Sequence, residues 1–255
     1  MTQKTLPQSL LQLLNIADHV LDQGSGYIAA LDVTEKSVSR ATPHGINFEL
    51  SLLSPQGTRL LVFRNARGHS IPNGHFAVQR FDYNPPNRKI QRIATLCSYN
   101  SADNLLKDFF AAIDRVLFMR KHNISVHDRQ GQTAIRQQLL KMAAHEGEID
   151  KPGIWFPTES ALHRVLTENA SHLLQTIRER QPASITELSR LTDQSYGRVR
   201  RTLSILIRYR FVALFCEGNH LQPVDNSVWM QTNVASASTP RHQHLSRDTL
   251  QVNRS

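Results

Sequence analysis

Residues 184–215 read SITELSRLTDQSYGRVRRTLSILIRYRFVALF, and this stretch decides the fold that the sequence predicts. Ser184 and Glu187 have the spacing of a capping box, in which each side chain satisfies a free amide at a helix start. Three apolar residues at helical spacing would give this first helix a buried face: Ile185, Leu188 and Leu191. Residues 192–195 (TDQS) have short polar side chains typical of a turn and of a new helix start. The stretch therefore predicts two helices joined by a tight turn.

The second helix is expected from Tyr196 to Tyr209, with one apolar and one basic face. Its apolar positions are Tyr196, Val199, Leu203, Leu206 and Ile207. The opposite positions are Gly197, Arg198, Arg201, Ser204, Ile205 and Arg208, with Arg200 on the flank. No acidic residue occurs between Gln194 and Cys216. Such a helix suits the major groove of DNA, although a solvated basic helix would show the same pattern.

Segments on both sides complete a DNA-binding fold. Residues 158–180 carry apolar residues at helical spacing, enough for a short and a longer supporting helix. Residues 211–215 and 220–224 read as strands around the turn 217–219, which is a hairpin signal. A hairpin that follows a recognition helix forms the wing of a winged helix-turn-helix. We therefore expect such a domain over residues 154–225.

Composition and charge limit the classes of partner. The chain has 255 residues and a net charge of +9, which favours anionic partners and above all nucleic acid. An anionic membrane is the competing partner, but no segment pairs a polybasic face with a broad apolar one, and no apolar run has membrane-spanning length. Cys97 and Cys216 lie far apart in the sequence, each in a strand-like segment. We therefore expect both to be buried packing residues rather than a disulfide or a metal-binding pair. With no signal peptide in the sequence, we expect a cytoplasmic protein that binds no membrane.

The N-terminal half changes from helical to strand periodicity. Leucines at helical spacing predict an N-terminal helix within residues 1–26. A strand at 27–33 precedes period-two segments that predict two hairpins, with strands at 46–52, 58–63, 75–83 and 90–98. Ser101 would cap a helix with an apolar stripe. Residues 27–120 therefore read as an α+β domain, a small antiparallel sheet with a packing helix.

Two polar segments complete the predicted organisation. Residues 121–153 read as a linker that could hold a helix near 133–144. Residues 226–255 have little apolar periodicity and many Ser, Thr, Asn and Gln residues, so we expect a disordered tail. The sequence thus predicts an α+β protein with an N-terminal sheet domain and a C-terminal winged helix-turn-helix.

A pattern in the C-terminal region resembles a known family. It consists of Pro-x-Ser-Ile-x-Glu-Leu, then Val-x-Arg-Thr-Leu, then an aromatic residue and a valine. Its positions here are Pro182, Ser184, Ile185, Glu187, Leu188, Val199, Arg201, Thr202, Leu203, Tyr209 and Val212. Residues 156–214 in this way resemble the winged-helix regulators that include the TumA antitoxins. Arg210 stands where such domains usually place glycine, so the resemblance implies a reshaped turn into the wing.

The N-terminal half resembles a second family at fewer positions. Residues 63–75 read FRNARGHSIPNGH, and a helix with Leu105, Leu106, Asp108 and Phe109 follows. The TumE toxin family has a similar hairpin end, Tyr-Asp-Asn-Glu-Arg-Gly, then Lys-Gly-Asp-His-Arg-His and a Leu-x-x-Asp-Phe helix. The loop positions that match are Asn65, Arg67, Gly68 and His75. Members of this family are thought to be ribonucleases, so the resemblance implies RNA as a candidate substrate.

The residues of the loop limit this implied chemistry. A ribonuclease without a metal needs a base, an acid and a cation near the scissile phosphate. The candidate catalytic residues are His69, His75, Arg67 and Asn65. Arg64 and Ala66 replace the acidic residues of the family, which removes groups that could orient a histidine or hold a metal. We therefore expect a binding or dimerisation module rather than an active nuclease.

The sequence as a whole predicts a DNA-binding transcriptional regulator that binds palindromic double-stranded DNA as a homodimer. The candidate DNA-binding residues are Ser184, Thr186, Ser195, Tyr196, Arg198, Arg200, Arg201, Ser204 and Arg208. Arg198, Arg201 and Arg208 would face the groove, while Arg200 and the wing would contact phosphates. The N-terminal module or the helix near 133–144 could hold the dimer.

The sequence holds no P-loop, dinucleotide fingerprint or zinc-spaced Cys/His set, so we expect no cofactor and no metal. Two alternatives to the regulator remain open. The first is a fused toxin–antitoxin protein whose N-terminal half cleaves RNA. The second is a replication or partition factor of a plasmid or mobile element, which would use the same winged helix.

Overall fold

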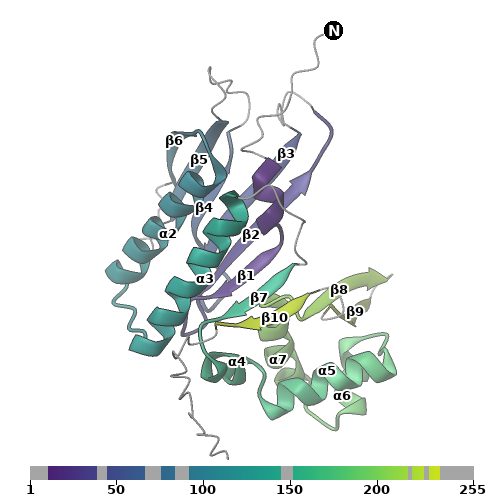
Figure 1. The fold of residues 1–255 in the computed structure, drawn as a ribbon. Helices are drawn as coiled ribbons and strands as arrows, with labels where there is room; N and C mark the ends of the chain where they lie inside the picture. Colours follow the sequence, from purple (N-terminus) through teal and green to yellow (C-terminus); the bar gives the residue numbers. More distant parts are fainter. Residues whose placement is uncertain are drawn as a thin grey trace, which may run out of the picture.

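The structure, a computed structural model, describes residues 11–38, 45–66, 76–83, 92–144, 152–217, 220–226 and 230–235 (Figure 1). The protein belongs to the α+β class, as predicted. Its main sheet has eight strands in the order β10-β7-β1-β2-β3-β4-β5-β6, and β8 and β9 form a separate hairpin. The sheet is therefore larger than the small antiparallel one expected.

Strands β2 to β6 form an antiparallel meander. Their bounds are β2 Ile28–Glu35, β3 Ile46–Leu53, β4 Arg59–Asn65, β5 Phe76–Tyr83 and β6 Arg92–Tyr99. Alternate residues of β3, such as Phe48 and Leu50, are buried in the same core as Phe63 of β4. Both predicted hairpins are thus present, and β3 of the first hairpin has its predicted apolar face inward.

Two long helices cover this face of the sheet: α2 Ala102–Met119 and α3 Val126–Ala144 (Figure 1). Helix α2 buries its apolar stripe, including Phe109 and Ile113, against the strands. Helix α3 is longer than the helix considered near 133–144, and it adds Ile135 and Leu139 to the same core. The predicted linker 121–153 therefore contains a structural helix, because its apolar residues complete a core rather than span a gap.

The predicted N-terminal helix is largely replaced by a strand. Of residues 11–26, only a 3-10 helix at Gln12–Ile16 is helical over several residues, and β1 follows at His19–Asp22. Leu13 of the predicted apolar pattern is buried, but so is Ile16, which that pattern did not include, and Leu11 and Leu14 are only half-buried. Strand β1 is buried at every position because it pairs with strands on both sides, and tertiary pairing overrides helical periodicity here. Residues 1–10 lie outside the described residues.

The C-terminal region contributes two strands to this sheet. Strand β7, Gly153–Phe156, pairs parallel with β1, and β10, Gln231–Val234, pairs parallel with β7. Strand β10 falls within the predicted tail 226–255, of which residues 227–229 and 236–255 are outside the described part of the chain. Met230, just before β10, is buried in the second core. The two predicted domains thus share one sheet instead of meeting at a linker.

The second core belongs to the helical unit, which we define as residues 159–225. It contains α4 Glu159–Val165, α5 Glu168–Arg180, α6 Ile185–Leu191, α7 Tyr196–Arg208, β8 Val212–Glu217 and β9 His220–Asp225. Phe156 of β7 is buried in this core and stacks on Tyr209 and Phe211, with ring centroids 5.5 and 6.5 Å apart. We call residues 12–144 the N-terminal module. Within the described residues, no helix is long and apolar enough to cross a membrane.

Candidate nucleic-acid interface

The start of α6 is capped by the predicted pair. Ser184 Oγ accepts a hydrogen bond from the amide of Glu187 at 3.1 Å. The Glu187 carboxylate accepts from the amide of Ala183 at 2.8 Å, one residue before the position that a standard capping box uses. Both side chains therefore satisfy free amides, and the helix begins where the sequence predicted.

The turn between α6 and α7 is held by its polar side chains. Thr192 Oγ1 donates to the carbonyl of Leu188 at 2.8 Å, and Ser189 Oγ donates to the carbonyl of Gln194 at 2.5 Å. Asp193 has a left-handed backbone with φ 51°, a conformation that aspartate adopts more readily than most residues. The predicted turn is present, but the side chains that hold it are Thr192 of the TDQS segment and Ser189 of α6, and they bond carbonyls rather than free amides.

Helix α7 buries a narrow apolar face. Val199, Leu203 and Leu206 are buried, as expected. Tyr196 is 48% exposed, so its assignment to the buried face was wrong. It is the first residue of the helix and lies beyond the cover of the neighbouring helices. Its exposure instead agrees with its place among the candidate DNA-binding residues.

The opposite face of α7 is exposed and cationic. The exposed residues there are Gly197, Arg198, Arg200, Arg201, Ser204 and Ile205. Within the described part of the chain, no carboxylate forms an ion pair with Arg198, Arg200 or Arg201. Arg201 Nε donates to the carbonyl of Gly197 at 3.2 Å, which leaves its terminal nitrogens for other acceptors. A cationic helix face without carboxylate partners can bind an anionic surface without first breaking ion pairs.

The remaining candidate residues lie at the starts of α6 and α7. Thr186 and Ser195 are exposed, while Ser184 is half-buried. Ser195 occupies the N-cap position of α7, but its hydroxyl makes no capping bond. Anions are favoured at the N-terminal end of a helix, where backbone amides lack partners within the helix.

Arg208 departs from the predicted arrangement. It is half-buried, and its Nε and Nη1 atoms have neither solvent access nor a hydrogen-bond partner. A Cβ placed on Gly57 would lie only 3.9 Å from Arg208 Cδ, so the side chain runs along the β3–β4 turn. The last turn of α7 faces the N-terminal module, and Arg208 is not part of the exposed cationic face.

The β8–β9 hairpin follows α7 as predicted, with Val212 opposite Asp225. Its sequence, residues 212–225, contains no lysine or arginine. Phe215 and Leu221 are 58% and 47% exposed. The hairpin that was predicted to contact phosphates therefore has no lysine or arginine with which to do so.

The residue at the turn into the hairpin has a specific role. Arg210, where the resemblance to winged-helix regulators implied a departure from glycine, adopts a left-handed backbone with φ 63°. Its guanidinium pairs with Asp32 of β2 and, at 3.5 Å, with Asp18. The departure from glycine could be noticed in the sequence, but its partners could not, because they lie in the N-terminal module.

The candidate ribonuclease residues divide into two groups. His69, His75 and Arg67 lie outside the described residues. Asn65, at the end of β4, accepts from the amide of Phe48 at 2.7 Å and donates to the carbonyl of Ile46 at 2.9 Å. Its side chain completes the β3–β4 ladder, so Asn65 has a structural role that the sequence did not indicate. Among the described residues, no group of three His, Cys, Asp or Glu residues could hold a metal ion.

Asp108 of the TumE-like helix pattern is also engaged in a contact within the N-terminal module. The hydroxyl of Tyr99 in β6 donates to its carboxylate, which links α2 to the edge of the sheet. Burial and the neighbouring Asp108 raise the pKa of Tyr99, so this hydroxyl stays protonated. Phe109, the next residue of that pattern, is buried in the core.

Comparison with known families gives a match in the C-terminal region. Residues 165–226 match the HVO_A0114 family, whose function is uncharacterised. The match spans α5, α6, α7 and the β8–β9 hairpin and stops short of the N-terminal module. No curated protein and no solved structure matches the chain. The part of the chain that is similar to a described family is therefore the helical unit that carries the cationic face.

Proposed function

We propose that the protein is a DNA-binding transcriptional regulator that reads its operator through a winged helix-turn-helix. In this proposal α6 and α7 are the helix-turn-helix, α7 is the recognition helix, and the β8–β9 hairpin is the wing. The observation that carries the proposal is the exposed face of α7, where three arginines have no carboxylate partner among the described residues. A helix of this kind fits the major groove, where arginine binds the O6 and N7 atoms of guanine.

The proposal assigns different roles to the arginines of α7. Arg198 and Arg201 lie on the side opposite the buried Val199 and Leu203, so they would reach base edges. Arg200 would contact phosphates, and the hydroxyls of Thr186 and Ser195 would do so near the helix starts. We leave Arg208 out of this interface because its guanidinium is largely inaccessible.

Arg201→Ala should weaken binding to the specific site by about 1–3 kcal/mol if Arg201 reads a guanine. The operator would first be located by footprinting on the promoter of the gene itself, and affinity would then be measured by fluorescence anisotropy at fixed salt. Arg115→Ala is the matched control, since Arg115 is an exposed residue of α2, and Figure 1 shows that α2 and α7 lie on different parts of the molecule. Equal affinities of the two variants would exclude α7 as the reading surface.

We further propose that the protein binds a palindromic operator as a homodimer, since most helix-turn-helix proteins pair two half-sites about one helical turn or its multiples apart. Light scattering of the protein with and without operator DNA would give the number of copies. A single copy on a non-palindromic site would contradict this part of the proposal.

The purified protein should leave RNA intact under conditions in which it binds operator DNA. The physical reason is that Asn65 is engaged in the β3–β4 ladder and the acidic groups of the loop are replaced by Arg64 and Ala66. A labelled RNA would be incubated with the protein and separated on a denaturing gel. Cleavage that disappears in a His75→Ala variant would instead favour the fused toxin–antitoxin protein.

A further inference from the structure

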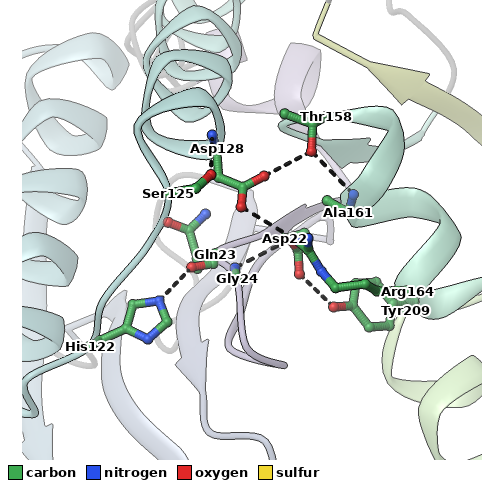
Figure 2. A network of polar contacts seen from close by, with 10 residues as sticks. All are labelled: Asp22, Gln23, Gly24, His122, Ser125, Asp128, Thr158, Ala161, Arg164 and Tyr209. Atoms are coloured by element: carbon green, nitrogen blue, oxygen red, sulfur yellow. Dashed lines mark hydrogen bonds and ion pairs between the residues drawn. The ribbon is translucent and has the colours of Figure 1, made fainter.

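We propose that the N-terminal module controls DNA binding by fixing the position of the recognition helix, with Tyr209 and Arg210 as the positioning residues. The proposal rests on the proposed function for its DNA readout. Its structural basis is a set of polar contacts between the two parts of the chain (Figure 2). None of these residues lies on the exposed cationic face of α7.

The first contact ends the recognition helix. The hydroxyl of Tyr209, the C-cap residue of α7, donates to Asp22 Oδ1 at 2.6 Å, and both side chains are buried (Figure 2). Asp22 is the last residue of β1, and its Oδ2 accepts from the amide of Gly24 at 3.2 Å. The two carboxylate oxygens therefore tie the end of α7 to the end of a central strand.

Burial makes the hydrogen bond between Tyr209 and Asp22 costly to break. Burial raises the pKa of Asp22, while the hydrogen bonds from Tyr209 and Gly24 lower it in part. A buried carboxylate that loses its donor keeps its desolvation cost, so the pair strongly favours one arrangement over displaced ones. Apolar packing alone would allow α7 to slide more easily on the sheet.

The next residue of the chain makes a second contact. The guanidinium of Arg210 pairs with Asp32 and Asp18 of the N-terminal module, as described above. The side chain of Asn226 donates to the carbonyl of Arg210 at 3.1 Å, and its backbone amide donates to the carbonyl of Phe211 at 2.9 Å. The turn from α7 into the β8–β9 hairpin is thus held from both sides.

A third contact fixes the start of the helical unit. Thr158, the N-cap of α4, donates to Asp128 Oδ1 at 2.8 Å and accepts from the amide of Ala161 at 3.1 Å (Figure 2). Arg164 Nη2 lies 3.4 Å from Asp128 Oδ2. Burial alone would raise the pKa of Asp128, but the hydrogen bonds from Thr158 and Ser125 and the charge of Arg164 lower it, so the carboxylate is ionised at neutral pH.

The end of β1 is also held in place by contacts within the N-terminal module. His122 lies 2.9 Å from the carbonyl of Gln23, through its Nε2 atom (Figure 2). Arg136 of α3 contacts the side chain of Gln23 at 3.1 Å and that of Asp114 at 2.8 Å. The end of β1 is therefore fixed to α3, so Asp22 offers Tyr209 a rigid partner.

Because of these contacts, we expect the recognition helix to move together with the N-terminal module as one rigid unit. A change at the end of β1 would move the C-terminal end of α7, although β1 touches no exposed arginine of that helix. Affinity for the operator would thus depend on residues that never meet DNA. This gives the N-terminal module a role in the regulator that requires no catalysis.

The test compares Tyr209→Phe with Tyr83→Phe, a matched removal of one hydroxyl from β5. We expect Tyr209→Phe to lose about tenfold in operator affinity, within the range of typical couplings between sites. Binding to non-specific DNA should be unchanged, because the exposed arginines remain. Asp22→Asn should show a non-additive effect with Tyr209→Phe in a double-mutant cycle.

Arg210→Gly keeps the proposal testable if Tyr209→Phe is poorly folded. Glycine relieves the left-handed strain at this position, so the fold should persist while both ion pairs are lost. We expect a similar loss of operator affinity. Operator affinity equal to that of the wild type in folded Tyr209→Phe and Arg210→Gly would overturn the proposal.

A measurement without DNA separates this inference from the proposed function. Hydrogen exchange of the amides in the last turn of α7 should become faster in Tyr209→Phe and in Arg210→Gly, and stay the same in Tyr83→Phe. Unchanged exchange would overturn the positioning role whatever the DNA result. A wild-type protein that binds no specific DNA would instead contradict the proposed function while faster exchange still supported the positioning contacts.

Discussion

Gly131→Ala is expected to lower the free energy of unfolding by about 3 kcal/mol, the upper end of typical overpacking costs. Gly131 lies in α3, where alanine would ordinarily be preferred to glycine. A Cβ at this position would lie 2.6 Å from the carbonyl carbon of Pro157 and 2.7 Å from its Cα. Backbone atoms cannot rotate away as a side chain can, so α3 and the segment after β7 would have to separate.

Gly197→Ala is the matched control for this prediction. Gly197 also lies in a helix, but a Cβ there would meet nothing within 4 Å. Alanine should therefore stabilise α7 by up to about 1 kcal/mol. Urea unfolding followed by circular dichroism would measure both variants. Stabilisation by Gly131→Ala would show that α3 does not approach Pro157 this closely.

Phe156→Ala should lower the free energy of unfolding by about 3–5 kcal/mol. Phe156 is fully buried in β7, and its ring stacks on Tyr209 and Phe211 at interplanar angles of 19° and 13°. Removing it loses apolar burial and leaves a cavity between the sheet and the helical unit. The cost should be large because rings from a strand, from the end of α7 and from the residue before β8 all meet there.

Phe118→Ala is the matched control for Phe156→Ala, because it removes the same side-chain atoms from a position on the surface. Phe118, near the end of α2, is 83% exposed, so its loss should change stability by less than about 0.5 kcal/mol. Both variants would be measured by denaturant unfolding with the same probe. A cost below about 1.5 kcal/mol for Phe156→Ala would indicate that this site can collapse around the missing ring.

Local signals predicted the elements of the C-terminal region well. Ser184, Glu187 and the TDQS turn determine helix ends through short-range hydrogen bonds, which sequence spacing can express. The two N-terminal hairpins were found for a similar reason, since period-two alternation follows from one buried face. Such features depend on neighbours within a few residues.

The joined sheet was not predicted because its signals are not local. Strand β7 has only four residues, and its partner β1 lies far earlier in the chain, before the meander and both long helices. Strand β10 reads QTNV, which lacks the apolar pattern of a strand. Its place depends on pairing with β7 and on the burial of the preceding Met230, which no window along the sequence can express.

In the candidate interface, too, local sequence patterns predicted some features correctly, whereas contacts between distant segments determined the others. The helical period correctly separated Val199 and Leu203 from Arg198 and Arg201. It could not separate Arg208 from these arginines, because the turn at Gly57 that covers Arg208 comes from a distant hairpin. Contacts between distant segments therefore decided which predicted residues stay accessible.

The parallel pairing of β7 with β1 has a consequence for the order in which the chain folds. During synthesis β1 is made early, yet the strand that pairs with it on one side follows only after α3. Until β7 arrives, one edge of β1, a strand that is fully buried in the folded protein, is open to pairing with other chains. The pairing of β7 with β1 closes the long segment between these strands, and this is slower than the formation of local hairpins and helices. The helices of the helical unit can therefore form before that unit packs against the N-terminal module. The sheet is complete only after β7 has paired with β1.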